Sequence, residues 1–192
     1  MVCTHQGDGN MQGIANPRNT KQVKNVQQKK TEGSMLSRDD LYNLIQLSPH
    51  LDGFVKHVKL YPDLVCIVSL PEMITQFNQL VDVKSTEQLF PSYDTFNLGD
   101  CYVSAIVFKH ILFKETPLVP LAFVIHDRQF GSVHEHFFSF IKSAIPKIYK
   151  KKIPIVVDRE PSIRKAIQTI LPDCPVLLCW NHIRGDFKYH LQ

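Results

Sequence analysis

The sequence predicts an α/β protein: a mixed five-stranded sheet flanked by helices, preceded by a small α+β region and a basic arm. Three strand-like segments follow one another between residues 88 and 125, and strand and helix patterns then alternate as far as Val176–Cys179. In this order the first three strands form a meander. The later strands return parallel to it after helical crossovers.

Composition limits the kind of protein further. The chain has 192 residues, 44% of them hydrophobic, and a formal net charge of +4. This size suits one ordinary domain with an appendage, and the mild positive charge permits a nucleic-acid partner without requiring one. Five widely spaced cysteines argue for a reducing compartment. The N-terminus is polar and every apolar run is far shorter than roughly 20 residues, so we expect an intracellular protein with no membrane partner.

The first part of the chain is divided in two. Residues 1–36 are expected to be a disordered basic arm, because they are rich in Gln, Asn, Gly and Lys and lack apolar periodicity. The alternative is an arm that contacts DNA through its scattered cations. Residues 37–87 form the small α+β region, with a helix over 38–47, a strand over Val65–Leu70 and a second helix that starts at Pro71.

Residues 88–192 are expected to form the main domain. Continuous or alternating apolar segments predict strands, and apolar residues every three or four positions predict helices. The expected strands are Leu89–Phe96, Asp100–Phe108, Pro120–Ile125, Ile153–Val157 and Val176–Cys179, and the expected helices are Val133–Ile145 and Pro161–Leu171. Pro146 is expected to stop the first helix, and another helix is expected to start after His182. This is the strand order of the ribonuclease-H-like fold.

Two aspartates lie where function commonly collects. Asp94 is on the first strand of the main domain, and Asp158 directly follows the fourth, which is its neighbour in the expected fold. Carboxylates that converge from adjacent strands are ligands that Mg²⁺ prefers, and paired Mg²⁺ ions promote phosphoryl transfer. The alternative is structural, because an aspartate just before a helix commonly caps it, and the same holds for Glu160.

Cys179-Trp-Asn-His182 follows the last expected strand, and its thiol and imidazole are metal-ligand types. One Cys-x-x-His is half of a zinc site. Cys174 and His190 are the nearest candidates to complete it, in a spacing that matches no established structural zinc pattern. The alternative is that Cys179 packs as a small buried residue and that His182 caps or packs against a helix start.

Two other histidine motifs receive no catalytic assignment. His126-Asp127-Arg128 lacks the glycine-rich loop and the other elements of a kinase. His134 and His136 are two positions apart, whereas the zinc-protease helix motif needs four.

Four separated motifs occur in the order found in one family: Tyr93–Ser104, Pro120–Arg128, Val156–Glu160 and Cys179–His182. Over roughly residues 88–192 the chain resembles the Mutator-like element (MULE) transposase domain. The resemblance implies a ribonuclease-H-like fold and a nuclear DNA transposase that acts on transposon ends, and it leaves a homo-oligomer open. Its Asp-Asp-Glu triad would bind Mg²⁺ or Mn²⁺ to cleave and transfer DNA strands.

The resemblance also assigns residues. It implies that Asp94 and Asp158 are the two catalytic, metal-binding aspartates and that Cys179 and His182 are the family's Cys-x-x-His, a candidate Zn²⁺ pair. One departure concerns the strand itself, because a single threonine, Thr95, stands where relatives carry two. Since a one-residue change on a strand turns later side chains to the opposite face, we expect a bulge or loop adjustment that absorbs it, or else an Asp94 that points away from Asp158.

The other departure concerns the third carboxylate, which the resemblance places on a helix well after His182, whereas the sequence ends at Gln192. Glu160 cannot replace it, because it lies beside Asp158. Losing a metal ligand costs orders of magnitude in rate. We therefore expect a transposase core present as a truncated fragment. The alternatives are an inactive, domesticated or decayed nucleic-acid-binding or interaction domain, and an α/β domain whose acids only cap helices.

Overall fold

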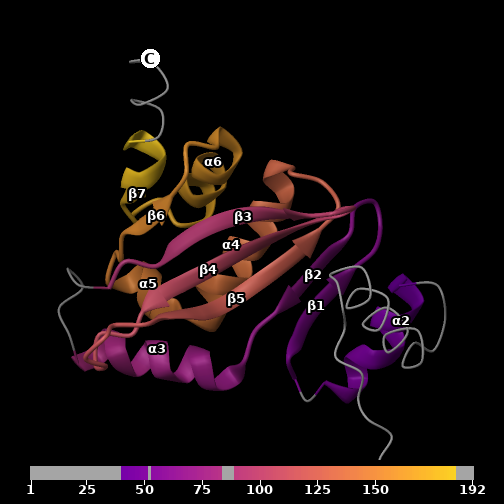
Figure 1. Ribbon diagram of the computed structural model, residues 1–192, viewed down its shortest axis with the longest axis horizontal. Coiled ribbons are helices and arrows are strands. Elements are labelled where there is room, and N and C mark those ends of the chain that lie inside the picture. Colours follow the sequence, from indigo (N-terminus) through magenta and orange to yellow (C-terminus); the bar gives the residue numbers. More distant parts are fainter. Residues whose placement is uncertain (1–39, 52, 84–88, 185–192) are drawn as a thin grey trace, which may run out of the picture. The chain divides into compact units, whose positions relative to one another are not determined.

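The computed structural model describes residues 40–51, 53–83 and 89–184 (Figure 1). The expected arm, residues 1–36, and the candidate ligand His190 lie outside these ranges. The chain divides into two compact units, residues 1–44 and 45–192. Helix α2 (Asp40–Leu47), which agrees with the helix expected there, spans their boundary and is followed by the short 3₁₀ helix η1 (Ser48–His50). The second unit contains the whole sheet and every candidate site residue.

Seven strands form one mixed sheet in the order β1-β2-β5-β4-β3-β6-β7. Their bounds are Val55–Lys59 (β1), Val65–Val68 (β2), Ser92–Leu98 (β3), Cys101–Lys109 (β4), Leu118–His126 (β5), Ile155–Val157 (β6) and Val176–Leu178 (β7). Strands β3, β4 and β5 form the expected antiparallel meander, β6 pairs with β3 in parallel, and β7 pairs with β6 in parallel. The predicted α/β class and mixed sheet are confirmed, but the expected count of five strands is not.

The two additional strands come from the predicted α+β region. Strands β1 and β2 are antiparallel, and β2 joins the sheet at β5. The sequence predicted β2, whose four residues are all buried. It did not predict β1, because Val-Lys-His-Val-Lys has little apolar content. An edge strand exposes one side to water, so lysines are well tolerated there and the usual pattern is weak.

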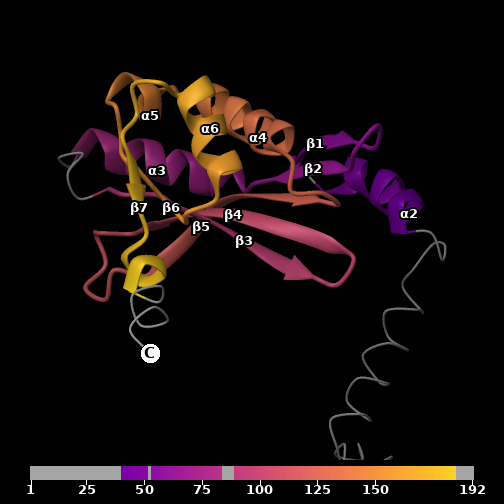
Figure 2. The same ribbon diagram turned by 90° about the horizontal axis from the view of Figure 1, so that it is seen from above.

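Four helices cover one face of the sheet: α3 (Pro71–Val83), α4 (Gly131–Ala144), α5 (Pro146–Lys150) and α6 (Pro161–Ile170) (Figure 2). Pro146 ends α4 as predicted, and it also opens α5, where a missing backbone N–H costs nothing. Pro161 opens α6 in the same way. Within the ranges that the structure describes, none of the helices is long and apolar enough to cross a membrane.

The core lies between this sheet face and the helices. Its largest fully buried side chains include several aromatic residues. The ring centroid of Tyr93 on β3 lies 5.5 Å from that of Phe137 and 5.0 Å from that of Phe138, both on α4. Phe77 of α3 meets Phe108 of β4 edge-on at 5.0 Å. Aromatic pairs in such arrangements add to the burial energy, and they fix α4 and α3 on the sheet.

Lysines near α5 stabilise helix ends. The Nζ of Lys142 donates to the carbonyl of Ile170 at the end of α6, at 2.8 Å. The Nζ of Lys151 donates to the carbonyl of Val81 near the end of α3, at 2.6 Å. Cations at helix C-termini satisfy free carbonyls and oppose the negative end of the helix dipole. Part of the positive charge therefore has a structural role that needs no nucleic acid.

Candidate functional site

Asp94 lies on β3, and Asp158 directly follows β6, the strand that pairs with β3 in parallel. Tyr93 of β3 is opposite Val157 of β6, and the next residue along each strand direction is an aspartate. Tyr93 and Val157 are both fully buried, and Tyr93 packs toward the helices. Because side chains alternate along a strand, Asp94 is directed to the opposite face of the sheet. The fold thus brings together two acids that are distant in the sequence.

The electrostatics of Asp94 link it to two other groups. Its pKa is raised above the ordinary value, mainly because burial penalises the ionised carboxylate. The charge of His182 opposes this and lowers the pKa, whereas the charge of Asp158 raises it. Asp158 and His182 are therefore both close enough to Asp94 to influence its carboxyl group.

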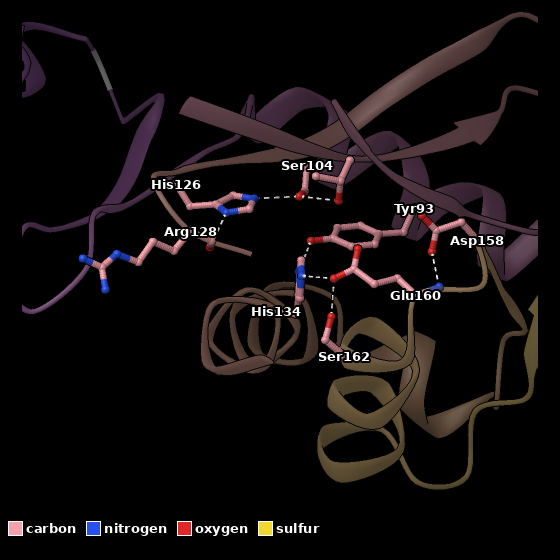
Figure 3. A network of polar contacts seen from close by, with 9 residues as sticks. Tyr93, Ser104, His126, Arg128, His134, Asp158, Glu160 and Ser162 are labelled. Atoms are coloured by element: carbon pink, nitrogen blue, oxygen red, sulfur yellow. Dashed lines mark hydrogen bonds and ion pairs between the residues drawn. The ribbon is translucent and has the colours of Figure 1, made fainter. Parts of the chain in front are cut away.

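Asp158 also shapes the turn that leads into α6. Its Oδ1 accepts a hydrogen bond of 2.8 Å from the backbone N–H of Glu160 (Figure 3). This resembles the structural role that we considered for an aspartate before a helix. It does not exclude metal binding, because an ionised carboxylate has about four lone-pair positions and this bond uses one. The turn instead holds the carboxylate in a defined orientation.

Strand β3 is regular around Asp94. It pairs with β4 without a break from Ser92 opposite Val107 to Leu98 opposite Cys101. The single threonine was expected to cause a bulge or loop adjustment, or to turn Asp94 away from Asp158. No bulge is present in β3, and Asp94 directly follows Tyr93, which is opposite Val157. Phe96, two residues further on, lies on the same face as Asp94 and is 54% exposed.

A helical segment spans residues 180–184, so Cys179 lies just before it and His182 lies within it. The helix expected to start after His182 therefore begins earlier than predicted. The backbone N–H of Cys179 donates to the carbonyl of Val157 at 2.7 Å, and the carbonyl of Cys179 accepts from the N–H of Ile183 at 3.2 Å. These bonds fix the Cys-x-x-His beside the end of β6, which carries Asp158.

Cys174 is buried and hydrogen-bonded in the core. It is 5% exposed, and its Sγ donates to the carbonyl of Ile148 at 3.5 Å. Burial, with a smaller contribution from Asp173, raises the pKa of Cys174 to about 11, so the metal-free residue is a thiol at pH 7. Among residues 40–51, 53–83 and 89–184, no three His, Cys, Asp or Glu side chains are grouped for a metal ion.

Two chains of polar contacts start at Tyr93 and Thr95, the neighbours of Asp94 in the sequence, and sequence reasoning missed both. Figure 3 shows Tyr93, Ser104, His126, His134 and Glu160 of these chains. The first chain starts at Thr95, whose Oγ1 lies 2.8 Å from Oγ of Ser104. The same Ser104 oxygen lies 2.9 Å from Nε2 of His126. Nδ1 of His126 donates to the carbonyl of Arg128 at 2.8 Å. Burial lowers the pKa of His126 and favours the neutral ring. Its Nε2 is then an acceptor for the Ser104 hydroxyl, which fixes the direction of the whole chain.

The second chain starts at Tyr93. Its hydroxyl lies 2.8 Å from Nδ1 of His134 on α4, and Nε2 of His134 lies 3.8 Å from Oε1 of Glu160. The hydroxyl of Ser162 donates to the same carboxylate oxygen. Burial first, and then the charge of His126, lower the pKa of His134 to about 4, so the ring is neutral at pH 7. When the Tyr93 hydroxyl donates to Nδ1, the neutral ring carries its proton on Nε2, which faces Glu160.

The sequence held only an indirect signal for these chains. His126 and His134 stand in segments that are otherwise apolar, where a polar side chain must find a buried partner. That rule predicts hydrogen bonding but not the partner. The partners come from β3, β4 and α6, which only the folded sheet places beside them.

Acid should destabilise the protein through His134. An unfolded histidine titrates near pH 6.5, whereas the folded ring titrates at about 4, so the unfolded state binds the proton first as pH falls. Stability is then complete above pH 6.5 and declines between pH 6.5 and 4, by up to about 3 kcal/mol. Urea unfolding near pH 7 and near pH 4.5 measures this loss. His134→Gln should reduce it, and an equal loss in the variant and the wild type would contradict this assignment.

The fold and the site define a mixed α/β protein in which two acids directly follow a residue pair of adjacent parallel strands. No protein-family model and no curated protein matches this chain.

Proposed function

We propose that this chain carries part of a divalent-cation site for phosphoryl transfer on DNA, of the kind used by Mutator-like element transposases. The observation that carries the proposal is the pairing of Tyr93 on β3 with Val157 on β6, because Asp94 and Asp158 are the next residues after this pair. A meander followed by two parallel strands, with order β5-β4-β3-β6-β7, supports a ribonuclease-H-like core to which β1 and β2 are added at one edge. Such a protein would meet its DNA in the nucleus.

The donor set suits a hard divalent cation. Two carboxylates supply the oxygen ligands that Mg²⁺ and Mn²⁺ prefer. Asp94 is disfavoured as an anion by burial and by the charge of Asp158, and a cation held by both carboxylates would offset these effects. A bound metal would supply Lewis-acid stabilisation of charge on a phosphate. In this proposal Asp94 and Asp158 hold the metal, and the segment Cys179–His182 borders it.

Strand cleavage needs a third acid. Glu160 is the acid nearest to Asp158 in sequence, but its carboxylate is bonded to Ser162 and faces His134. This agrees with a third ligand from a helix after His182, as the resemblance implies. We therefore propose cation and DNA binding at the pair of aspartates, and strand cleavage where that third acid is present.

Cation-dependent DNA binding tests the proposal. Fluorescence anisotropy with a labelled DNA duplex should show tenfold or greater tightening in Mn²⁺ relative to EDTA. The reason is that a cation at the acid pair turns phosphate repulsion into attraction, an effect on the order of 1–4 kcal/mol. Asp158→Asn should remove this difference. Equal affinity in EDTA and Mn²⁺ would favour the inactive DNA-binding alternative, and absence of DNA binding would contradict both.

A further inference from the structure

Building on the proposed function, we infer that Tyr93, His134, Glu160 and Ser162 are positioning residues that hold Asp94 and Asp158 at the spacing a cation requires. They connect the residue before Asp94 to the turn after Asp158 by a path through α4 (Figure 3). None of the four is proposed to touch the metal. We name them the positioning chain.

The Tyr93 end of the positioning chain is firmly anchored. Tyr93 and His134 are both 0% exposed, and their rings are perpendicular with centroids 5.7 Å apart. Tyr93 also packs on two phenylalanines of α4. The backbone of β3 therefore cannot shift at Asp94 without disrupting buried contacts on the helix-covered face. Thr95 adds a second anchor, through Ser104, immediately on the other side of Asp94.

The Glu160 end controls the turn that carries Asp158. The backbone N–H of Glu160 donates to Asp158, while its side chain accepts from Ser162 and faces His134. A movement of Glu160 therefore moves a hydrogen-bond donor of the metal-binding carboxylate. Partners of this kind, which orient a ligand without touching the metal, typically change metal affinity roughly 10–100-fold when they are removed.

One atom in the positioning chain is left unsatisfied. Nε2 of His134 is buried and has no hydrogen-bond partner, and the Glu160 oxygen at 3.8 Å is just beyond bonding distance. A buried N–H without a partner is unfavourable. An approach of Glu160 toward α4 would give this atom its partner, and it would move the turn that carries Asp158.

Three single-hydroxyl deletions test the inference without changing charge. Tyr93→Phe and Ser162→Ala each remove one hydroxyl from the positioning chain. Ser69→Ala is the matched control, because Ser69 is 2% exposed and its hydroxyl donates to the carbonyl of Leu121 at 2.8 Å, outside the positioning chain. Mn²⁺ titration followed by electron paramagnetic resonance gives the affinity. Hydrogen exchange of the residue 160 amide, measured without metal, reports on the turn, and thermal melts report stability.

We expect Tyr93→Phe and Ser162→Ala to weaken Mn²⁺ binding roughly 10–100-fold and to speed exchange at residue 160. Ser69→Ala should change neither, although it also loses a buried hydrogen bond. If the wild type binds Mn²⁺ and both chain variants bind as tightly as the control, the positioning role is wrong and the cation site stands. If the wild type binds no Mn²⁺, the cation site fails and the positioning role fails with it. Should Tyr93→Phe not fold, the partly exposed Ser162→Ala variant decides.

Discussion

Asp94→Asn and Asp158→Asn are each expected to lower the affinity for Mn²⁺ on the order of 100-fold. Both carboxylates contribute charge to the proposed site, and an amide supplies an oxygen without the charge. Isothermal titration calorimetry of each variant measures the loss. Asp100→Asn is the control, because Asp100 is an exposed aspartate in the turn directly after β3 and should bind as the wild type does.

The stability of Asp94→Asn separates a lost site from a lost fold. The pKa of Asp94 is raised in the folded protein, mainly by burial, so the ionised carboxylate is unfavourable there. Stability associated with the protonated group is lost as pH rises through the folded pKa, and an amide cannot ionise. Asp94→Asn should therefore be at least as stable as the wild type near pH 7. Unchanged Mn²⁺ affinity, or a loss that accompanies unfolding, would contradict the proposed role.

Phe137→Ala is expected to reduce the free energy of unfolding by about 3–5 kcal/mol. Phe137 is 0% exposed, and its ring centroid lies 5.5 Å from Tyr93 and 5.8 Å from Phe138. Truncation leaves a cavity between α4 and β3 that these rigid rings cannot refill. Urea unfolding followed by circular dichroism measures the change.

The matched control is Phe113→Ala. Phe113 is 58% exposed, so its truncation should cost about 1 kcal/mol or less. Equal losses in the two variants would show that α4 does not pack on β3 as described, and the positioning of Tyr93 by α4 would lose its basis.

Strands with continuous apolar sequence were the most predictable part of the fold. Strands β2 and β6 are short and mainly buried, and both fall within their predicted segments. The order of the last five strands also followed from the alternation of elements. Strand β1 was missed because edge strands need no apolar pattern. The strand count was therefore wrong for a local physical reason and not because the class was wrong.

The candidate acids could be found from the sequence because they directly follow or interrupt apolar strand segments. That both acids directly follow paired residues of β3 and β6 could not be predicted from the sequence, because the register between these strands depends on packing over the whole sheet. The positioning chain was invisible for a similar reason. A histidine on the apolar face of a helix, such as His134, is equally consistent with packing, metal binding or a buried hydrogen bond. For His134, only the distances from its ring nitrogens to Tyr93 and to Glu160 in the folded protein distinguish these three roles.

Anomalous X-ray diffraction from crystals grown with Mn²⁺ tests the central claim most directly. The proposed site predicts an anomalous peak between the carboxylates of Asp94 and Asp158, with metal–oxygen distances of roughly 2.1 Å. It also predicts that the peak disappears in Asp158→Asn crystals. Carboxylates that point apart, or Mn²⁺ bound only elsewhere on the protein, would contradict the cation site and the phosphoryl-transfer function proposed from it.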